Sequence, residues 1–153
     1  MKKILAILAA VGLMAAAGTA MAADSTDLLV EAEVLAACSV ETVDNIDFGD
    51  LDPINDPATT TASTAPTGSA GSVRVTCTNL TSYSLGATPA SPTMTLNGGG
   101  TNPIAYTPVF TAGPFTAGTS ADIRTIDATV AKTAYETAPA GAYSGQLTIT
   151  VSY

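Results

Sequence analysis

Apolar and polar residues alternate with a period of two along most of this chain. In the stretch LTITVSY, residues 147–153, every second side chain is apolar, which is the pattern of a half-buried β-strand. No window of about 12 residues or more keeps the 3.6-residue period of an amphipathic helix. We therefore expect an all-β fold, in which each strand needs a neighbour along both edges or a reason to leave one open.

Turn signals rich in glycine, proline and asparagine separate the alternating segments. Many short strands in a chain of this length favour an antiparallel β-sandwich. Segment 58–70, ATTTASTAPTGSA, is low in complexity and is predicted to be a flexible loop. The predicted strands are 28–40, 45–51, 71–78, 82–87, 93–97, 104–110, 123–131 and 142–153.

The first residues have the pattern of a secretory signal peptide. Lys2 and Lys3 precede an apolar run at residues 4–17, and the triplet AMA at residues 20–22 is a small-x-small cleavage site. The run is shorter than the roughly 20 residues that a membrane-spanning helix needs. We expect residues 1–22 to be removed, the mature chain to be exported, and no stable membrane insertion after cleavage.

The mature chain is strongly acidic. Without Lys2 and Lys3, 3 basic residues face 13 acidic ones, a net charge of −10. This charge repels nucleic acid and anionic membrane surfaces, so neither is an expected partner. Two cysteines, Cys38 and Cys77, favour a single disulfide in an exported chain. Metal ligation by the cysteines is the alternative, and a chain without histidine supplies few other ligands for it.

The residues for most catalytic chemistry are missing. Without histidine there is no Ser-His-Asp or Cys-His arrangement, and neither GxSxG nor a phosphate-binding GxxxxGK[ST] occurs. The acidic stretch DNIDFGDLD, residues 44–52, lacks the glycine and terminal glutamate spacing of a calcium loop. We expect solvated surface acids, no enzyme activity, no metal and no cofactor. An ion site in segment 44–56, or a secreted enzyme that uses these acids, is the alternative.

The segment before the first cysteine carries an apolar row that can be interpreted in two ways. It can be the first strand of its own domain, or an arm that pairs with another molecule. The opposite side of the segment mixes leucine with Glu31 and Glu33. The residues of the row are Leu28, Val30, Ala32 and Val34.

From residue 36 to residue 153 the chain resembles the spore coat protein U domain family. That family contains the pilin subunits of archaic (Csu-type) chaperone–usher pili. The landmarks occur in the expected order. They are Cys38, the tetrapeptide IDFG at 46–49, SVRVTC at 72–77, Tyr83, IAYTPVF at 104–110 and PAGAYSGQLTITVSY at 139–153.

The resemblance implies an incomplete immunoglobulin-like antiparallel sandwich that a donor strand completes in trans. A periplasmic chaperone lends the strand first, and the arm of the next subunit replaces it at the outer-membrane usher, which is a form of β-augmentation. The implied organisation is a signal peptide at 1–22, a donor arm at 23–37 that can overlap the first strand, and a pilin domain at 38–153. The subunit would pass through the periplasm into an extracellular pilus.

The resemblance also implies roles for residues. The Cys38–Cys77 pair would staple the first strand to the sheet, and the apolar row would be the donor. Phe48 and Tyr106 are expected in the core rather than in a contact. The residues that would line the acceptor groove and meet the chaperone are Leu147, Ile149, Val151 and Tyr153.

The function implied is a structural subunit that polymerises and supports attachment and biofilm formation. Its partners would be other pilus subunits, the chaperone and the usher. The sequence is compatible with a major rod subunit and with a minor or adaptor subunit. The alternative is a self-contained secreted or spore-coat-type module that binds or builds structure without polymerising.

Overall fold

The computed structural model describes residues 25–153, so the predicted signal peptide lies outside the described residues. Val34–Tyr153 forms one compact unit, and all of its paired strands are antiparallel. In residues 25–153 the helical elements are two short 3₁₀ turns, Ala62–Thr64 and Lys132–Ala134. The predicted all-β, antiparallel class is confirmed. No helix among the described residues has the length and apolar character to cross a membrane.

One layer of the unit is built around β9 (Asp122–Ala131), its longest strand. The first half of β9 pairs with β3 (Gly71–Cys77), and β3 pairs in turn with β1 (Cys38–Asp44). The second half of β9 pairs with β2 (Thr59–Thr61) and with β7 (Thr107–Val109). In this arrangement β1 pairs along one of its edges only.

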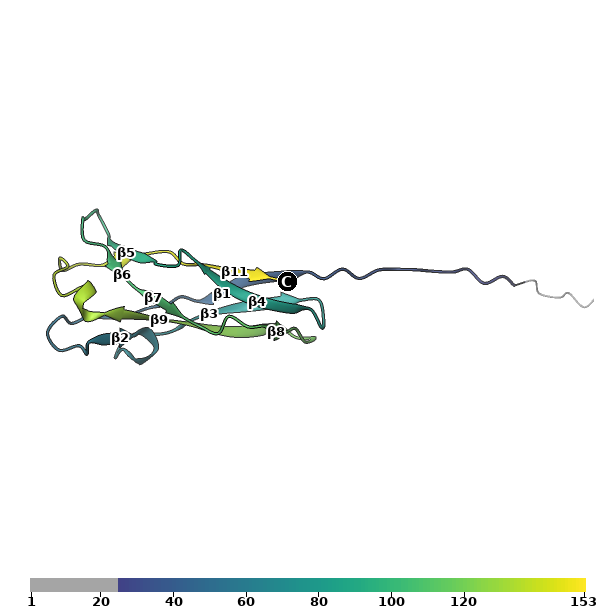
Figure 1. Ribbon diagram of the computed structural model, residues 1–153, viewed down its shortest axis with the longest axis horizontal. Helices are drawn as coiled ribbons and strands as arrows, with labels where there is room; N and C mark the ends of the chain where they lie inside the picture. Colours follow the sequence, from purple (N-terminus) through teal and green to yellow (C-terminus); the bar gives the residue numbers. More distant parts are fainter. Residues whose placement is uncertain (1–24) are drawn as a thin grey trace, which may run out of the picture. The chain divides into compact units, whose positions relative to one another are not determined.

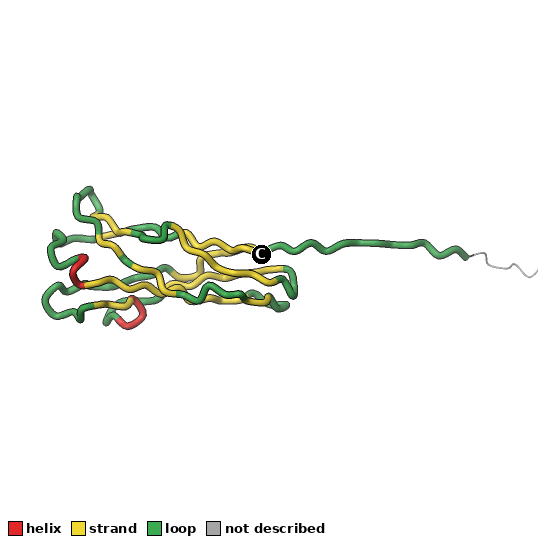
Figure 2. The backbone as a smooth tube through the Cα atoms, in the orientation of Figure 1, coloured by secondary structure: helices red, strands yellow, loops and turns green. Residues whose placement is uncertain are grey.

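The second layer consists of two three-stranded ladders, which lie end to end in Figures 1 and 2. In one ladder β4 is central, and in the other β5 is central. The C-terminal segment contributes β10 to one ladder and β11 to the other. In the part of the chain that the structure describes, these two strands pair, like β1, along one edge only. The first ladder has β11 (Thr148–Ser152), β4 (Ser82–Thr88) and β8 (Phe115–Thr116), and the second has β10 (Tyr143–Ser144), β5 (Thr93–Leu96) and β6 (Ile104–Ala105).

Two apolar clusters lie between the layers. The inward residues alternate along their strands, as Val73 and Val75 do on β3 and Tyr83 and Leu85 do on β4. Ile126 of β9 and Ala117 also belong to this first cluster. The second cluster is more aromatic, and its largest members are Phe48, Ile104, Tyr106, Val130 and Tyr135.

The predicted strand 28–40 is wrong over most of its length. Residues 28–37 carry no strand, and β1 begins at Cys38 and runs on to Asp44. A strand forms only where a second backbone completes its ladder of hydrogen bonds. β3 provides that backbone from Cys38 onward, and alternation alone does not reveal where a partner starts.

Segment 45–51 is also not a strand, although it was predicted to be one. It keeps a single isolated bridge, between Asp47 and Ser69. The Asp47 carboxylate accepts a hydrogen bond from the Gly49 N–H at 2.8 Å, and Gly49 adopts a φ of 63°. That left-handed conformation turns the chain out of the strand direction, and glycine adopts it without a Cβ clash.

Segment 58–70 is ordered by tertiary contacts, so the predicted flexible loop is wrong. β2 pairs with β9 inside it, and Thr60 and Ala62 are buried. The Ser63 side chain donates a hydrogen bond to the Asp127 carboxylate. Low complexity describes local composition only, whereas burial and strand pairing decided the conformation here.

Four predicted strands, 71–78, 82–87, 93–97 and 123–131, match β3, β4, β5 and β9 within a residue at each end. The two others are split. Segment 104–110 breaks at Tyr106, because β6 pairs with β5 and β7 pairs with β9. Segment 142–153 breaks between Ser144 and Thr148.

A polar cluster joins the two layers beside the first core cluster. The Tyr83 hydroxyl on β4 donates to Asp122 Oδ2 at 2.6 Å, and Arg124 Nε donates to the Tyr83 oxygen at 3.2 Å. Arg124 also pairs with Asp122 and lies 3.8 Å over the Phe115 ring. The hydrogen bond from Tyr83, and after it the hydrogen bond and the positive charge of Arg124, hold the pKa of Asp122 below its usual value.

We predict that Asp122→Asn weakens the fold at neutral pH and flattens its acid sensitivity. Because the folded-state pKa of Asp122 is lowered, its contribution is complete above the unfolded pKa of about 3.9 and disappears as pH falls through the folded value. At pH 7 the variant should lose about 1–3 kcal/mol of unfolding free energy. Urea unfolding between pH 7 and about pH 2 measures both effects.

Asp50→Asn, at an exposed position, is the control and should change stability by less than about 0.5 kcal/mol. An Asp122→Asn variant whose acid unfolding curve overlays that of the original protein would contradict the assignment.

Candidate functional site

The open edges of β1 and of β10–β11 are the feature that sets this molecule apart from a closed sandwich. Among the described residues β1 pairs only with β3, β10 only with β5 and β11 only with β4. Edge strands present unpaired N–H and C=O groups that can bind another strand. Three of the other edge strands have proline: β7 contains Pro108, while Pro103 and Pro114 immediately precede β6 and β8. The short edge strand β2 has none. Proline cannot donate to a ladder, and neither β1 nor β10–β11 contains one.

A groove of about 960 Å³ separates these two edges. One wall is the segment from Thr42 to Pro53, which continues β1, and the other runs from Ala138 to Ile149 through β10. Its floor comes from both layers of the sandwich. The floor residues are Val73, Met94, Ile104, Tyr106, Ile126 and Tyr135.

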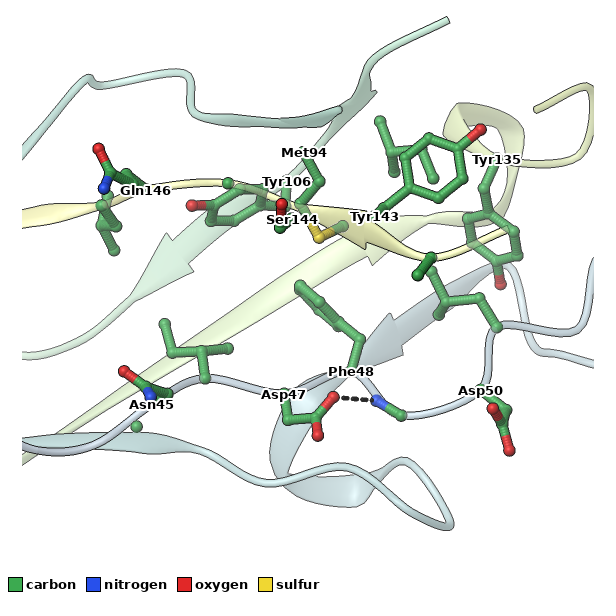
Figure 3. Close-up of a pocket in the computed structure, with 18 of the residues that line it drawn as sticks. Asn45, Asp47, Phe48, Asp50, Met94, Tyr106, Tyr135, Tyr143, Ser144 and Gln146 are labelled. Carbon is green, nitrogen blue, oxygen red and sulfur yellow. Dashed lines mark hydrogen bonds between the residues drawn. The ribbon is translucent and has the colours of Figure 1, made fainter. Parts of the chain in front are cut away.

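The groove has an aliphatic half and an aromatic half. Ile46 packs against both core clusters and therefore lies at the boundary. Figure 3 shows Phe48 on one wall facing Met94 and Tyr106, and the Phe48 and Tyr106 rings meet edge to face with centroids 6.0 Å apart. Burial raises the pKa of Tyr106 and of Tyr135, so both phenols stay neutral at physiological pH.

One end of the groove is closed and the other is open. At the closed end β1 and β11 lie side by side, and Cys38 and Val40 pack against the same cluster as Ile149 and Val151. The lining at the opposite end reaches Pro53 and residues 138–141. A chain that fills this groove and continues along its length away from the closed end passes Pro53, and we call this end the mouth.

The four predicted acceptor residues fall into three places. Leu147 and Ile149 line the groove. Val151 lies beyond the closed end and packs against the first core cluster. The Tyr153 side chain is 63% exposed. Phe48 and Tyr106, which we expected in the core, are buried there and also line the groove.

Sequence reasoning did not identify the wall that continues β1. Ile46 and Leu51 are partly buried and face the groove from that wall. Ile46 and Phe48 alternate with polar residues, and this pattern led to the incorrect strand at 45–51. One signal could have identified this wall: the apolar residues of segment 46–51 come directly after β1, a strand that pairs along one edge only within residues 25–153.

The apolar row is largely exposed in the structure. The exposed fractions are 86% for Leu28, 83% for Val30 and 81% for Val34. Residues 25–37 carry no strand. Extended, exposed apolar residues in a row bring together the side chains that an apolar groove can bury.

The residues just before β1 are held in place by Thr78. Its side chain donates to the Leu35 carbonyl at 3.0 Å and accepts from the Ala37 N–H at 3.2 Å. Its own N–H donates to the Ala37 carbonyl at 2.8 Å. The predicted disulfide, between the directly opposed Cys38 and Cys77, lies one residue further on.

The acidic segment is used for local structure. Asp52 accepts hydrogen bonds from the Ile54 and Asn55 N–H groups and from the Asn55 side chain, and the last of these most strongly lowers the pKa of Asp52. Asp56 accepts from the Asp52 N–H and bonds the Tyr135 hydroxyl. Residues 25–153 contain no cluster of three metal-ligating side chains. The groove itself combines apolar surface with strand edges, and these are the features that the binding of an extended peptide requires.

Comparison with known families decides the classification. A family model of the Spore Coat Protein U domain matches residues 24–150. The chain belongs to this family. The spore coat protein U family includes subunits of Csu-type pili and is structural in character. A search of curated proteins finds no match to this chain. In this spore coat protein U domain the match covers both the groove and the apolar row.

We predict that Gly49→Ala destabilises the domain. A Cβ at Gly49 would lie 2.8 Å from the Thr67 carbonyl carbon and even closer to the Thr67 hydroxyl, and φ is +63°. A residue forced into this conformation should cost about 1–3 kcal/mol, and Phe48 should lose its fixed place on the groove wall. Chemical denaturation of the purified protein gives the change in unfolding free energy.

Gly118→Ala is the matched control, because that position is exposed and a Cβ there meets nothing within 4 Å. It should change stability by less than about 1 kcal/mol. Equal losses in the two variants would show that the Gly49 turn has no special role.

Proposed function

We propose that this chain is a structural subunit of an extracellular chaperone–usher pilus that polymerises by donor-strand complementation. In this proposal residues 1–22 are removed on export, residues 23–37 form the donor arm and residues 38–153 form the pilin domain. A periplasmic chaperone would occupy the groove until the usher exchanges it for the arm of the next subunit. The fibre would support attachment and biofilm formation.

The observation that carries the proposal is the groove between two strand edges that no proline protects. A peptide strand placed there would pair with β1 on one side and with β10–β11 on the other. Such a strand would satisfy both rows of edge groups and join the two layers. The chain also contains a matching ligand, the exposed row from Leu28 to Val34.

The closed end of the groove sets the direction of the arm. Since the root of a bound arm must leave at the mouth, Val34 would lie near Pro53 and Leu28 near the closed end. The arm would then run parallel to β1 and antiparallel to β10–β11. An antiparallel pair is slightly more stable per residue than a parallel one. The row spans roughly 20 Å at about 3.3 Å per residue, which fits inside a groove walled by segment 42–53.

Burial of the row would supply much of the driving force. Each of Leu28, Val30 and Val34 would contribute about 1.5–3 kcal/mol before the cost of ordering the arm. Arm and groove are different surfaces, so the contact is heterologous and does not close on itself. Repetition of such a contact generates a filament.

We predict that Val30→Asp abolishes polymers that resist SDS at room temperature. The substitution would place a carboxylate in an apolar groove, where an unpaired charge is strongly unfavourable. We expect at least about a tenfold loss of polymer, equivalent to about 1.4 kcal/mol. Gel electrophoresis of unboiled samples from cells that express the chaperone and usher provides the measurement.

Leu29→Asp is the matched control. Leu29 is as exposed as Val30 but belongs to the opposite side of the arm, which would face solvent in the filament. It should leave the polymer ladder intact. If Leu29→Asp abolished the polymers and Val30→Asp did not, the face of the arm that enters the groove would be the one that carries Leu29, contrary to the proposal.

Deletion of residues 24–35 tests the proposal as a whole. The shortened chain should still bind the chaperone, because its groove is intact, and should form no polymers. A folded monomer that stays stable without chaperone, with or without the arm, would favour a self-contained secreted module instead.

A further inference from the structure

The turn after Cys77 presents an apolar side chain to solvent in a strained conformation. Leu80 is 76% exposed and has a φ of 64°, the only positive φ of a non-glycine residue among the described ones. Left-handed backbone is unfavourable for a branched side chain, and such outliers gather where a surface has a function. The turn is fixed, since the Leu80 N–H donates to the Ala117 carbonyl at 2.9 Å and the Thr81 N–H to the Thr78 carbonyl at 3.0 Å.

A second fixed loop presents an apolar side chain beside the mouth of the groove. Ile54 is 83% exposed and follows Pro53, which lines the groove. Lys132 Nζ donates to the Ile54 carbonyl at 2.9 Å and to the Asp56 carbonyl at 3.0 Å. The Ile54 N–H donates to Asp52 at 2.8 Å. The loop is thus held rigid while its largest apolar group contacts solvent.

The arm root connects these two loops in a polymer. Thr78 is bonded to Leu35 and Ala37, so the Leu80 turn lies within a few residues of the point where the arm leaves its domain. If Val34 sits at the mouth of a neighbour's groove, Leu35 and Thr78 must lie just outside that mouth. The neighbour's Ile54 loop borders the same opening.

We propose that Leu80 of one copy packs against the Ile54 loop of the copy that receives its arm. This inference rests on the proposed function and adds a second contact between successive subunits. Its partner is a second copy of this chain. Both loops are ordered before they meet, which limits the entropy lost on contact. The contact would restrict bending at Leu35–Ala37, the segment that links one domain to the next.

Pair-specific cross-linking in assembled polymers tests the contact. The double variant Leu80→Cys with Ile54→Cys would be assembled in cells and treated with a short bismaleimide, which joins neighbouring thiols without the geometry of a disulfide. Adjacent thiols react at high effective concentration. We therefore expect at least about tenfold more boiling-resistant ladder than from the control pair Leu80→Cys with Val109→Cys, in which Val109 is exposed on β7.

Unboiled samples distinguish the two hypotheses, because they show whether polymers exist before cross-linking. Polymers with no more cross-linking than the control pair would overturn the contact and leave the proposed function standing. Stronger cross-linking of Leu80→Cys with Tyr153→Cys would also overturn it, since the arm would then leave at the opposite end. Absence of polymers from the unmodified chain would overturn both.

A measurement without new cysteines covers the case in which the double variant does not assemble. Leu80→Gly removes the side chain at a backbone conformation that glycine adopts freely, so the domain itself should fold. Its polymers should dissociate in urea about fivefold faster than those of Val109→Ala, since lost contacts act mainly on dissociation rates. Equal dissociation rates would contradict the proposal.

Discussion

The structure depends on the unpaired N–H and C=O groups along two strand edges. A β-sandwich is stable when its layers cover each other and its edge groups find partners. Here β1 and β10–β11 border the same groove, and each pairs along one side only within the described chain. The core beneath them is divided between two clusters, with Ile46 in contact with both. A single inserted strand would join edges, layers and clusters at once, so its binding would also stabilise the fold.

The distribution of proline gives that arrangement its selectivity. Pro103, Pro108 and Pro114 stand in or directly before the outer strands β6, β7 and β8, where they limit pairing with stray chains. The two edges beside the groove have no such protection. In the proposed complex the partner would be restricted in another way, since the groove would favour an extended segment with apolar side chains on one side. Acidic residues on the other side of the arm, Glu31 and Glu33, would stay in water.

Sequence alone predicted the strands whose alternating residues coincide with alternating burial. β3, β4, β5 and β9 were found because their inward residues face a core on one side only. The errors arose where the residue pattern does not reveal the contact or turn that decides the conformation. Segment 58–70 looks featureless until β9 pairs with Thr59–Thr61, and the strand predicted at 45–51 is ended by the Gly49 turn. Of the four residues predicted to form an acceptor groove, Leu147 and Ile149 line the groove of the structure, and their role stays a prediction. The contacts of Thr78 could not be predicted, because a lone threonine carries no pattern.

The reach of the chain explains why the arm would serve another copy rather than its own groove. The arm is continuous with β1 at Cys38, whose side chain packs at the closed end. Leu28 lies ten residues before Cys38, a span of at most roughly 33 Å. The mouth lies beyond Leu51, after the whole groove wall has been passed. If the arm turned back along its own wall, these ten residues would be used up before the apolar row could reach the mouth and enter the groove. The turn would also break the hydrogen bonds of Thr78 to Leu35 and Ala37. A neighbouring copy can place the mouth of its groove next to the root of the arm, so the apolar row can be buried there while the Thr78 hydrogen bonds stay intact.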